Sequence, residues 1–452
     1  MSDVTGAAHD ARAFDSADDT CRPGGARSRV SGAAPRFAVA NLGCRVNRVE
    51  LDAIAAELEA SGCELVDETA ADLVVVNTCA VTGEAEAKAR KAVRHAAQLP
   101  HGPLVVATGC VASLFTGELE ALAPNVVVEP EKERVATRAL GLLGVEPRVL
   151  AGAGVVRAGC GSGGTVTPTG RMRPGLKVQD GCDHRCTYCI VWKARGAARS
   201  LDADEVVSRV RALVDEGARE VVLTGIDLGR YESAGLDLSG LLARILDETE
   251  VGRVRLSSVE PAGVTPELLA LMAESDGRVA PFLHVPLQSG CDATLARMGR
   301  PYTSAEYLHV ATEARRIVRG LALACDLIVG FPGETEAEFA ASLETCRRVG
   351  FANMHVFRYS RRPGTSAATM DGQVAPDVMA ERSLAMRELA AASRRSYVES
   401  LVGTEQLVLV ERRGFGVTGG LVRALVDEGA SAGSLVRVRP ASVTPAGMLD
   451  AR

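Results

Sequence analysis

Aromatic residues are scarce in this chain of 452 residues, where Phe, Trp and Tyr together make up 4% and Trp occurs once. No apolar run approaches the length of a membrane span, so we expect no membrane partner. Positive charge is not in excess, because the formal net charge is −6. Global charge therefore does not indicate a nucleic-acid binder, and any RNA contact must come from local basic patches. No secretory leader is visible, which favours a cytoplasmic protein.

Cysteine, in contrast, is abundant, with 12 residues. In a small secreted chain so many cysteines would indicate disulfide bonds. This chain is long and shows no export signal, so its thiols are expected to stay reduced. Reduced thiols in this number indicate metal or cluster ligation.

Apolar runs and polar breaks divide the chain into five segments. Residues 1–35 are polar and acidic, which predicts a disordered tail rather than a transit peptide. Residues 36–145 and 173–395 alternate Val-rich strands with helical stretches, which predicts parallel sheets covered by helices. The Gly- and Thr-rich residues 146–172 are aperiodic, as in a linker. Residues 396–449 hold short strands separated by turns, which predicts a small all-β barrel.

The longer β/α series predicts an incomplete TIM-like barrel of the (β/α)6 type. Its six candidate strands are 175–179, 219–224, 253–257, 281–285, 322–328 and 353–357. A long helix near 376–398 follows them. The predicted fold class is therefore α/β, with an N-terminal parallel α/β domain, a central incomplete barrel and a C-terminal all-β barrel.

Three cysteines of the first series share one placement. Cys44, Cys79 and Cys110 each follow an apolar strand, in the segments FAVANLGC, LVVVNTC and LVVATGC. The carboxyl ends of parallel strands meet at one edge of a sheet, where ligand sites form. Three thiolates with no fourth partner suit an iron–sulfur cluster that has one open iron. The alternative is three buried core cysteines, since Cys often packs as a small apolar residue.

A second group of three cysteines is closer together. Cys182, Cys186 and Cys189 follow the strand segment GLKVQ with the spacing C-x3-C-x2-C. In a β/α barrel this position belongs to the catalytic face. Structural zinc normally takes four ligands from paired units, and no second pair is visible here. Such a loop can hold a [4Fe–4S] cluster by three irons, whereas zinc or a ferredoxin-like redox site is the alternative.

This spacing on the first strand of a β/α barrel resembles the radical S-adenosylmethionine (SAM) superfamily, and the two cysteine groups together resemble its methylthiotransferase family. The resemblance runs from about Phe37 to Pro445. The C-terminal β segment is similar to the TRAM domain, which in this family contacts RNA. The segments that carry the resemblance are NLGCRVNRVE (41–50), VVNTCAVT (75–82), ATGCVA (107–112), VQDGCDHRCTYCI (178–190), VVLTGIDLGRY (221–231), RLSSVEP (255–261), LHVPLQSG (283–290), DLIVGFPGETEAEF (326–339) and HVFRYSRRPGTSAA (355–368).

The resemblance implies two [4Fe–4S] clusters, one on each cysteine group, with S-adenosyl-L-methionine bound at the second. All six cysteines would then be catalytic. It also implies that five other residues bind the cofactor, although the tyrosine among them is equally explained as a packing aromatic. These five are Tyr188, Gly225, Asp227, Gly330 and Gly333.

Within the family, the segments GCRVN, LSSVEP and HVFRYSRRPGT most resemble the branch that acts on threonylcarbamoyladenosine at position 37 of tRNA. The resemblance implies transfer of a methylthio group to carbon 2 of that adenine. It further implies an electron donor such as flavodoxin or ferredoxin, and we expect a monomer. The chain departs from the family pattern at Val191, Trp192 and Lys193, and at Cys291.

Basic residues near the expected catalytic mouth predict phosphate contacts. The RNA-binding candidates are Arg195, Arg199, Arg358, Arg361 and Arg362. A solvated charged surface is the alternative for this group. His284 and His355 fall in strand patterns, which favours core or pocket-wall positions over metal ligation.

Other functions remain open from the residues alone. The same chemistry could act on isopentenyladenosine in tRNA or on a ribosomal-protein side chain. A cluster-bearing RNA-binding protein without turnover is a third hypothesis.

Overall fold

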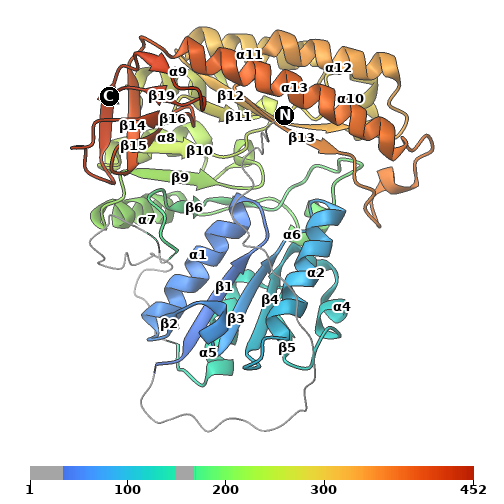
Figure 1. The fold of residues 1–452 in the computed structure, drawn as a ribbon, viewed down its shortest axis with the longest axis vertical. Helices are drawn as coiled ribbons and strands as arrows, with labels where there is room; N and C mark the ends of the chain where they lie inside the picture. The colour runs from blue at the N-terminus through green and yellow to red at the C-terminus, as the bar shows by residue number, and fades with distance from the viewer. Residues whose placement is uncertain (1–33, 148–166, 168) are drawn as a thin grey trace. The chain divides into compact units, whose positions relative to one another are not determined.

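The computed structural model of the protein describes residues 34–147, 167 and 169–452, and Figure 1 shows its fold. The predicted tail, residues 1–35, and the predicted linker, residues 146–172, lie largely outside the described residues. Within the described ranges, no helix is long and apolar enough to cross a membrane. Strands and helices alternate along most of the chain, so the predicted α/β class is confirmed.

The N-terminal region forms a parallel sheet with the strand order β2-β1-β3-β4-β5. Its strands are β1 (Arg36–Asn41), β2 (Glu64–Leu65), β3 (Leu73–Thr78), β4 (Leu104–Gly109) and β5 (Val126–Val128). Its helices are α1 (Arg45–Ala60), α2 (Gly83–Ala97), α3 (Cys110–Leu114), α4 (Thr116–Glu120) and α5 (Val135–Leu143). Every residue of β3 is buried, because this central strand is covered on both faces.

Alternate strand residues of this sheet enter two separate cores. Val75 lies in one core with Leu51 of α1 and Leu140 of α5. Val74 lies in the other core with Val93 of α2. This alternation is the two-residue period of a strand, and it explains why these strands read as continuous apolar runs.

The central region contains six parallel strands, as predicted. They are β6 (Gly175–Lys177), β9 (Glu220–Thr224), β10 (Arg253–Leu256), β11 (Phe282–His284), β12 (Ala322–Val329) and β13 (Asn353–Arg358). They form two three-stranded sheets, β10-β9-β6 and β11-β12-β13. Isolated parallel bridges, Val254 to Val279 and Ser258 to His284, join the two sheets. The arrangement is an incomplete barrel.

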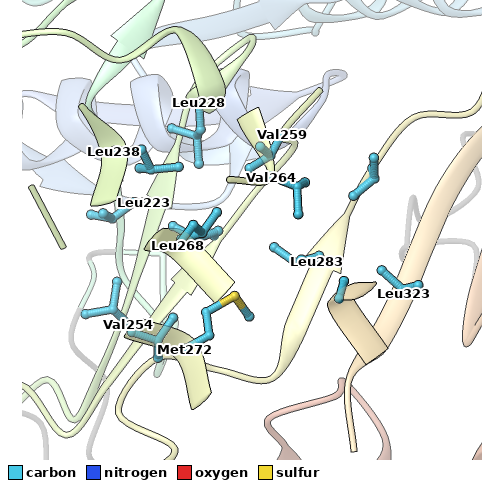
Figure 2. Close-up of a cluster of buried hydrophobic side chains, with 14 of the residues drawn as sticks. Leu223, Leu228, Leu238, Val254, Val259, Val264, Leu268, Met272, Leu283 and Leu323 are labelled. Carbon is cyan, nitrogen blue, oxygen red and sulfur yellow. The ribbon is translucent and has the colours of Figure 1, made fainter. Parts of the chain in front are cut away.

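Helices cover the outside of this barrel. They are α7 (Ala203–Asp215), α8 (Leu238–Glu248), α9 (Pro266–Glu274), α10 (Asp292–Met298), α11 (Ser304–Ile317), α12 (Glu336–Val349) and α13 (Pro376–Ser400). Between strands and helices lies the largest apolar core, part of which Figure 2 shows, with Leu223, Val254 and Leu283 from strands and Leu268 from α9. The cysteine loop is flanked by β7 (Gln179–Asp180), α6 (Val191–Arg195) and β8 (Arg199–Ser200).

The C-terminal region is one six-stranded sheet in the order β17-β14-β15-β16-β19-β18. Its strands are β14 (Gln406–Arg412), β15 (Phe415–Thr418), β16 (Arg423–Leu425), β17 (Leu435–Val438), β18 (Ser442–Val443) and β19 (Leu449–Asp450). All of its pairs are antiparallel except β16 with β19. The predicted small barrel is therefore open, because β17 and β18 form no ladder with each other within the described residues.

A buried charge cluster joins this sheet to the amino end of the barrel. Glu220, at the start of β9, accepts hydrogen bonds from Arg253 (2.7 Å) and Arg255 (2.6 Å) of β10. The two guanidinium groups also donate to main-chain carbonyls of the C-terminal sheet, at Leu407 (2.6 Å) and Gly419 (2.5 Å). Burial alone would raise the pKa of Glu220, but the two arginines outweigh it and lower the pKa to about 2.

Candidate functional site

The first cysteine group lies at the carboxyl edge of the N-terminal sheet. Cys44 precedes α1, Cys79 directly follows β3, and Cys110 opens α3 directly after β4. Burial, reinforced by repulsion from Cys44 and Cys110, raises the pKa of Cys79 to about 12. The structure thus brings these three thiols within electrostatic reach of one another.

Two buried asparagines and one glycine frame this group. The thiol of Cys44 donates to Asn47 Oδ1 (3.3 Å), and Asn47 Nδ2 donates to Asn77 Oδ1 and to the carbonyl of Thr78 (both 2.8 Å). Asn77 Nδ2 returns a bond to the Asn47 carbonyl (2.8 Å). Gly109 has φ +94°, and a Cβ there would lie 2.2 Å from the Thr78 carbonyl oxygen. Only glycine fits this turn into Cys110.

Arg195 is buried beside this group, with 1% of its side chain exposed. Its Nη1 donates to Glu50 and to Asp180 (both 2.9 Å), and its Nη2 donates to Asn47 (3.0 Å). Lys177 completes the network by bonding Glu50 (2.9 Å) and Asp180 (3.0 Å). The predicted RNA contact for Arg195 does not fit this burial, because the guanidinium is already surrounded by protein partners. Instead, Arg195 links α1 to the segment that carries the second cysteine group.

The second cysteine group occupies one loop between β7 and α6. Cys186 is buried, whereas Cys182 and Cys189 are half-buried. Burial raises the pKa of Cys189 to about 11. The hydrogen bond from the Val191 backbone N–H opposes this rise, and repulsion from Cys186 and Cys182 adds to it. The loop thus holds the three thiols within electrostatic reach of one another.

The loop begins on a glycine that no other residue could replace. Gly181 has φ +71°, and a Cβ there would lie 1.9 Å from the carbonyl oxygen of Ala197. Gly181 and Gly109 therefore have the same role, because each allows a turn directly before a cysteine that a larger residue could not adopt.

The sulfur spacing argues against compact zinc sites. In the described part of the chain, the three sulfur atoms of neither cysteine group lie within 4.8 Å of one another. Tetrahedral zinc with Zn–S bonds near 2.3 Å places its sulfur ligands about 3.8 Å apart. Both groups are therefore spaced more openly than a zinc site requires.

Arg300 contacts the second group, and sequence reasoning missed it. Its Nη1 donates to Cys186 Sγ (3.1 Å), its Nη2 pairs with Glu260, and its Nε donates to Tyr302 (3.1 Å). Burial raises the pKa of Glu260, opposed by Arg300. Glu260 follows the carboxyl end of β10, so the strand-end rule that found the cysteines could also have found it. Arg300 follows a helix and carries no such signal.

Tyr188 lies between the last two cysteines and meets Phe331 edge-on. The ring centroids are 6.4 Å apart and the planes are inclined by 83°. Phe331 belongs to the segment VGFPGE, so the structure brings together two of the predicted cofactor-side elements.

Gly225 and Asp227 both contact the base of the cysteine loop. A Cβ on Gly225 would lie 2.9 Å from the side chain of Gln179. The Oε1 of Gln179 accepts hydrogen bonds from the backbone N–H groups of Ile226 and Asp227 (both 2.9 Å). Asp227 Oδ2 lies 3.5 Å from His184 Nε2, inside the loop. Asp227 is therefore tied to the second cysteine group.

Gly330 and Gly333 both have positive φ angles, +73° and +75°. A Cβ on Gly330 would lie 2.2 Å from Met379 Cγ of α13, so packing alone requires glycine there. A Cβ on Gly333 would meet only the flexible side chain of Arg297, at 3.4 Å.

The other RNA-binding candidates divide into exposed and buried residues. Arg199 has 53% of its side chain exposed, and Arg358 and Arg361 are also exposed. Arg362 has 3% of its side chain exposed and pairs with Glu86 of α2 at 2.5 Å. The predicted RNA contact for Arg362 therefore does not fit its position.

The radical SAM superfamily model matches residues 176–346, and the model of the uncharacterized protein family UPF0004 matches residues 36–129. These two ranges contain the second and the first cysteine group, respectively.

The chain is 34% identical to the threonylcarbamoyladenosine tRNA methylthiotransferase MtaB of Treponema pallidum, over 89% of this chain and 97% of that protein. It is 36% identical to the MtaB of Bacillus subtilis, over 75% of this chain and 77% of that protein. It is also 34% identical to the tRNA-2-methylthio-N(6)-dimethylallyladenosine synthase of Sphingopyxis alaskensis, over 84% and 86%. Relatives of both kinds thus extend over both cysteine groups.

Among solved structures, the chain resembles the radical S-adenosylmethionine methyltransferase TsrM of Kitasatospora setae. The TM-score is 0.54 at 16% identity, covering 74% of this chain and 75% of that chain. At this identity the likeness concerns the fold alone.

Proposed function

This chain belongs to the radical SAM tRNA methylthiotransferases, and we propose that its substrate is threonylcarbamoyladenosine at position 37 of tRNA. The product would be the 2-methylthio derivative of that base. The observation that carries the proposal is the 34% identity to a relative named for this activity, over 97% of that relative. Relatives named for dimethylallyladenosine reach 35% identity, so isopentenyladenosine is the second candidate substrate.

Membership of the radical SAM superfamily implies one [4Fe–4S] cluster and SAM. We assign both to Cys182, Cys186 and Cys189. The donor set supports this assignment, because three thiols in one loop leave a cluster with an open iron. Arg300 donates to Cys186 Sγ from a buried position and is itself held by Glu260, so it orients this thiol within the cysteine group.

Four glycine and aspartate positions complete the proposed cofactor site with Tyr188. The ring of Tyr188 offers a flat face for the adenine of the cofactor. The remaining positions are Gly225, Asp227, Gly330 and Gly333. Among these positions, the structure supports a cofactor contact best for Asp227, because its carboxylate lies 3.5 Å from His184, a residue of the cysteine loop.

We assign a second [4Fe–4S] cluster to Cys44, Cys79 and Cys110. Their common sheet edge and their mutual electrostatic contact support this assignment. Arg195 lies within electrostatic reach of Cys44, where its charge opposes the burial that raises the pKa of this thiol.

When bound, the clusters and SAM supply the radical and sulfur-transfer chemistry that an unactivated aromatic C–H bond requires. The residues of the chain bind and orient the reactants. Exposed Arg199, Arg358 and Arg361 are placed to hold phosphates near the barrel mouth. A pocket of about 700 Å³ in the C-terminal sheet is lined by four arginines and two glutamates, namely Arg412, Arg413, Arg423, Arg452, Glu411 and Glu428.

Nucleoside mass spectrometry of tRNA from a deletion strain tests the substrate. We expect the 2-methylthio form of threonylcarbamoyladenosine to disappear and to return when the gene is restored. The 2-methylthio form of isopentenyladenosine should stay unchanged and serves as the internal control. Loss of the isopentenyl product alone would transfer the proposal to the second substrate. If neither nucleoside changed, a ribosomal-protein side chain would be examined next by peptide mass spectrometry.

Turnover and partners need separate measurements. Reconstituted protein with SAM and dithionite should release 5′-deoxyadenosine, whereas a cluster-bearing protein without turnover would not. We further propose that flavodoxin or ferredoxin donates the electron, and that the enzyme is a cytoplasmic monomer. Replacing dithionite by reduced flavodoxin, and sedimentation of the holoenzyme, test these two points.

A further inference from the structure

His284, Asp326 and His355 come from three neighbouring strands of the barrel, β11, β12 and β13. Asp326 Oδ1 lies 3.2 Å from His284 Nε2 and 3.0 Å from His355 Nδ1. The ligand atoms of all three residues lie within 4.8 Å of one another. In the part of the chain that the structure describes, no other three His, Cys, Asp or Glu side chains meet this closely.

The three side chains point into the barrel. Their strand neighbours Leu283, Leu327 and Met354 lie in the core between strands and helices, where Figure 2 labels Leu283. Because strand side chains alternate between faces, His284, Asp326 and His355 occupy the opposite, inner face.

The inner face is closed on one side of this group and accessible on the other. Two residues earlier on β11 and β12, Phe282 and Ala324 pack in a buried cluster with Tyr397 and Leu421. The side chain of His355, in contrast, is 51% exposed, and that of Asp326 is 30% exposed. A small ligand can therefore reach the group from the barrel interior.

Each imidazole is held from behind by a second side chain. The Nδ1 of His284 lies 2.8 Å from Ser258 Oγ, and the Nε2 of His355 lies 2.9 Å from the amide of Asn353. The nitrogens that face Asp326 have the carboxylate as their hydrogen-bonding partner. In metal-binding histidines the remote ring nitrogen commonly donates its N–H to an anchoring acceptor. Ser258 Oγ can accept in this way from His284, whereas Asn353 Nδ2 is a donor toward His355.

We propose that His284, Asp326 and His355 bind one divalent transition-metal ion, of the Zn²⁺, Fe²⁺ or Mn²⁺ class, inside the barrel. Two imidazoles and one carboxylate are a donor set for such ions, and they leave coordination positions open. Bonds of about 2.1 Å at tetrahedral or octahedral angles place neighbouring ligand atoms about 3.0–3.4 Å apart. The separations of 3.0 and 3.2 Å to Asp326 Oδ1 match this spacing.

The site is distinct from the two cysteine groups in residues and in donor chemistry. It also does not depend on the proposed substrate, because its ligands belong to the chain.

Zinc binding by the anaerobically reconstituted holoenzyme tests the proposal. Both clusters are loaded first, so that the cysteines are occupied, and the protein is dialysed against Zn²⁺ and analysed for zinc and iron. We expect the parent protein to retain one zinc ion per chain. The variants His355→Gln and Asp326→Asn should not retain it, because their affinity for zinc should be at least about 10-fold lower. Ser258→Ala, which removes only the anchor of His284, should weaken binding about 10-fold.

His309→Gln is the matched control, because His309 is exposed on α11, away from the three strands. It should retain zinc like the parent protein. Unchanged iron content and an unchanged circular dichroism spectrum identify the variants that have folded. Of these substitutions, His355→Gln should disturb folding least, because the side chain of His355 is 51% exposed. The proposal is overturned if the parent protein retains no stoichiometric zinc, or if folded His355→Gln and Asp326→Asn bind it as tightly as the parent. In that case the three residues form a hydrogen-bonded His–Asp–His network only.

Discussion

Cys182, Cys186 and Cys189 share one loop, whereas Cys44, Cys79 and Cys110 come from three strand ends separated by 35 and 31 residues. Both groups nevertheless lie at the carboxyl ends of parallel strands. In the loop, the thiols are close because the cysteines are only three or four residues apart in sequence and because Gly181 allows the turn into Cys182. In the sheet, the register of three strands does so, with help from the buried pair Asn47 and Asn77.

This difference separates a local site from a cooperative one. The loop site depends on few contacts, so it should survive changes elsewhere in the chain. The sheet site exists only while β1, β3 and β4 stay paired, and its stability is therefore that of the whole N-terminal sheet.

The largest expected effect comes from removing one thiol from each group. Cys186→Ala should abolish both 5′-deoxyadenosine release and methylthiolation, because the SAM-binding cluster is lost. Cys79→Ala should reduce methylthiolation at least about 10³-fold but leave 5′-deoxyadenosine release unchanged. This variant should bind about four iron atoms per chain, whereas the parent protein binds about eight. Product assays and iron analysis on the same preparations measure this. Loss of 5′-deoxyadenosine release in a folded Cys79→Ala protein would erase the distinction between the groups.

Arg195 tests whether the two groups are coupled. Arg195→Met leaves Glu50 buried with Lys177 as its charged partner, and leaves Asp180 with Lys177 and Arg199. Breaking a buried ion pair in this way costs about 3–5 kcal/mol in the free energy of unfolding. Urea denaturation should show this loss, and the first group should take up less iron.

The matched control for Arg195 is Arg199→Met. Arg199 also pairs with Asp180, but 53% of its side chain is exposed. Its loss should cost less than about 1 kcal/mol. Equal losses for the two variants would contradict a special role for Arg195.

Glu220 sharpens a second contrast, because the charge cluster at the amino end of β9 and β10 is buried, whereas the charged pair Arg36 and Asp72 at the amino end of β1 and β3 is exposed. The pKa of Glu220 is lowered from 4.5 to about 2, which corresponds to about 3 kcal/mol of stability. This stabilisation is fully present above about pH 4.5 and is lost as the pH falls through about 2. Glu220→Gln should therefore be about 3 kcal/mol less stable than the parent protein at pH 7.

The difference between the two proteins in urea denaturation should shrink between pH 4.5 and pH 2, since protonation removes the same charge from the parent. Glu248→Gln, an exposed change on α8, is the control and should show little difference at any pH. A gap that stayed constant with pH would mean that the charge of Glu220 is not what stabilises the cluster.

The smallest expected effects come from Gly109 and Gly181, the glycines of positive φ that precede Cys110 and Cys182. Gly109→Ala and Gly181→Ala each combine a positive φ with a clash against a backbone oxygen, so each should cost about 2–3 kcal/mol. The costs should differ in extent: Gly109→Ala should lower the stability of the whole N-terminal sheet, and Gly181→Ala should disturb only the loop. Hydrogen exchange by mass spectrometry locates the change. Gly102→Ala, with φ +61° and nothing within 4 Å of its Cβ, should cost about 1 kcal/mol.

Strand periodicity predicted the six barrel strands and the placement of both cysteine groups, because apolar runs and chain direction are local properties. Arg195 shows where this reasoning stops. The basic residues around Arg195 in the sequence predict a position on the surface. Arg195 is buried because it pairs with Glu50, which is 145 residues away in the chain. The meeting of His284 and His355 at Asp326 could not be predicted for the same reason, since it depends on the mutual register of three strands.

The amino-acid order alone determined that six thiols would follow strand ends, since the side-chain period of a strand and the direction of a parallel sheet leave little freedom. Tertiary structure decided which charges would be buried. A buried charge persists only where a partner of opposite charge meets it, and those partners come from distant parts of the chain. Arg300 with Glu260 and Arg195 with Glu50 are both of this kind.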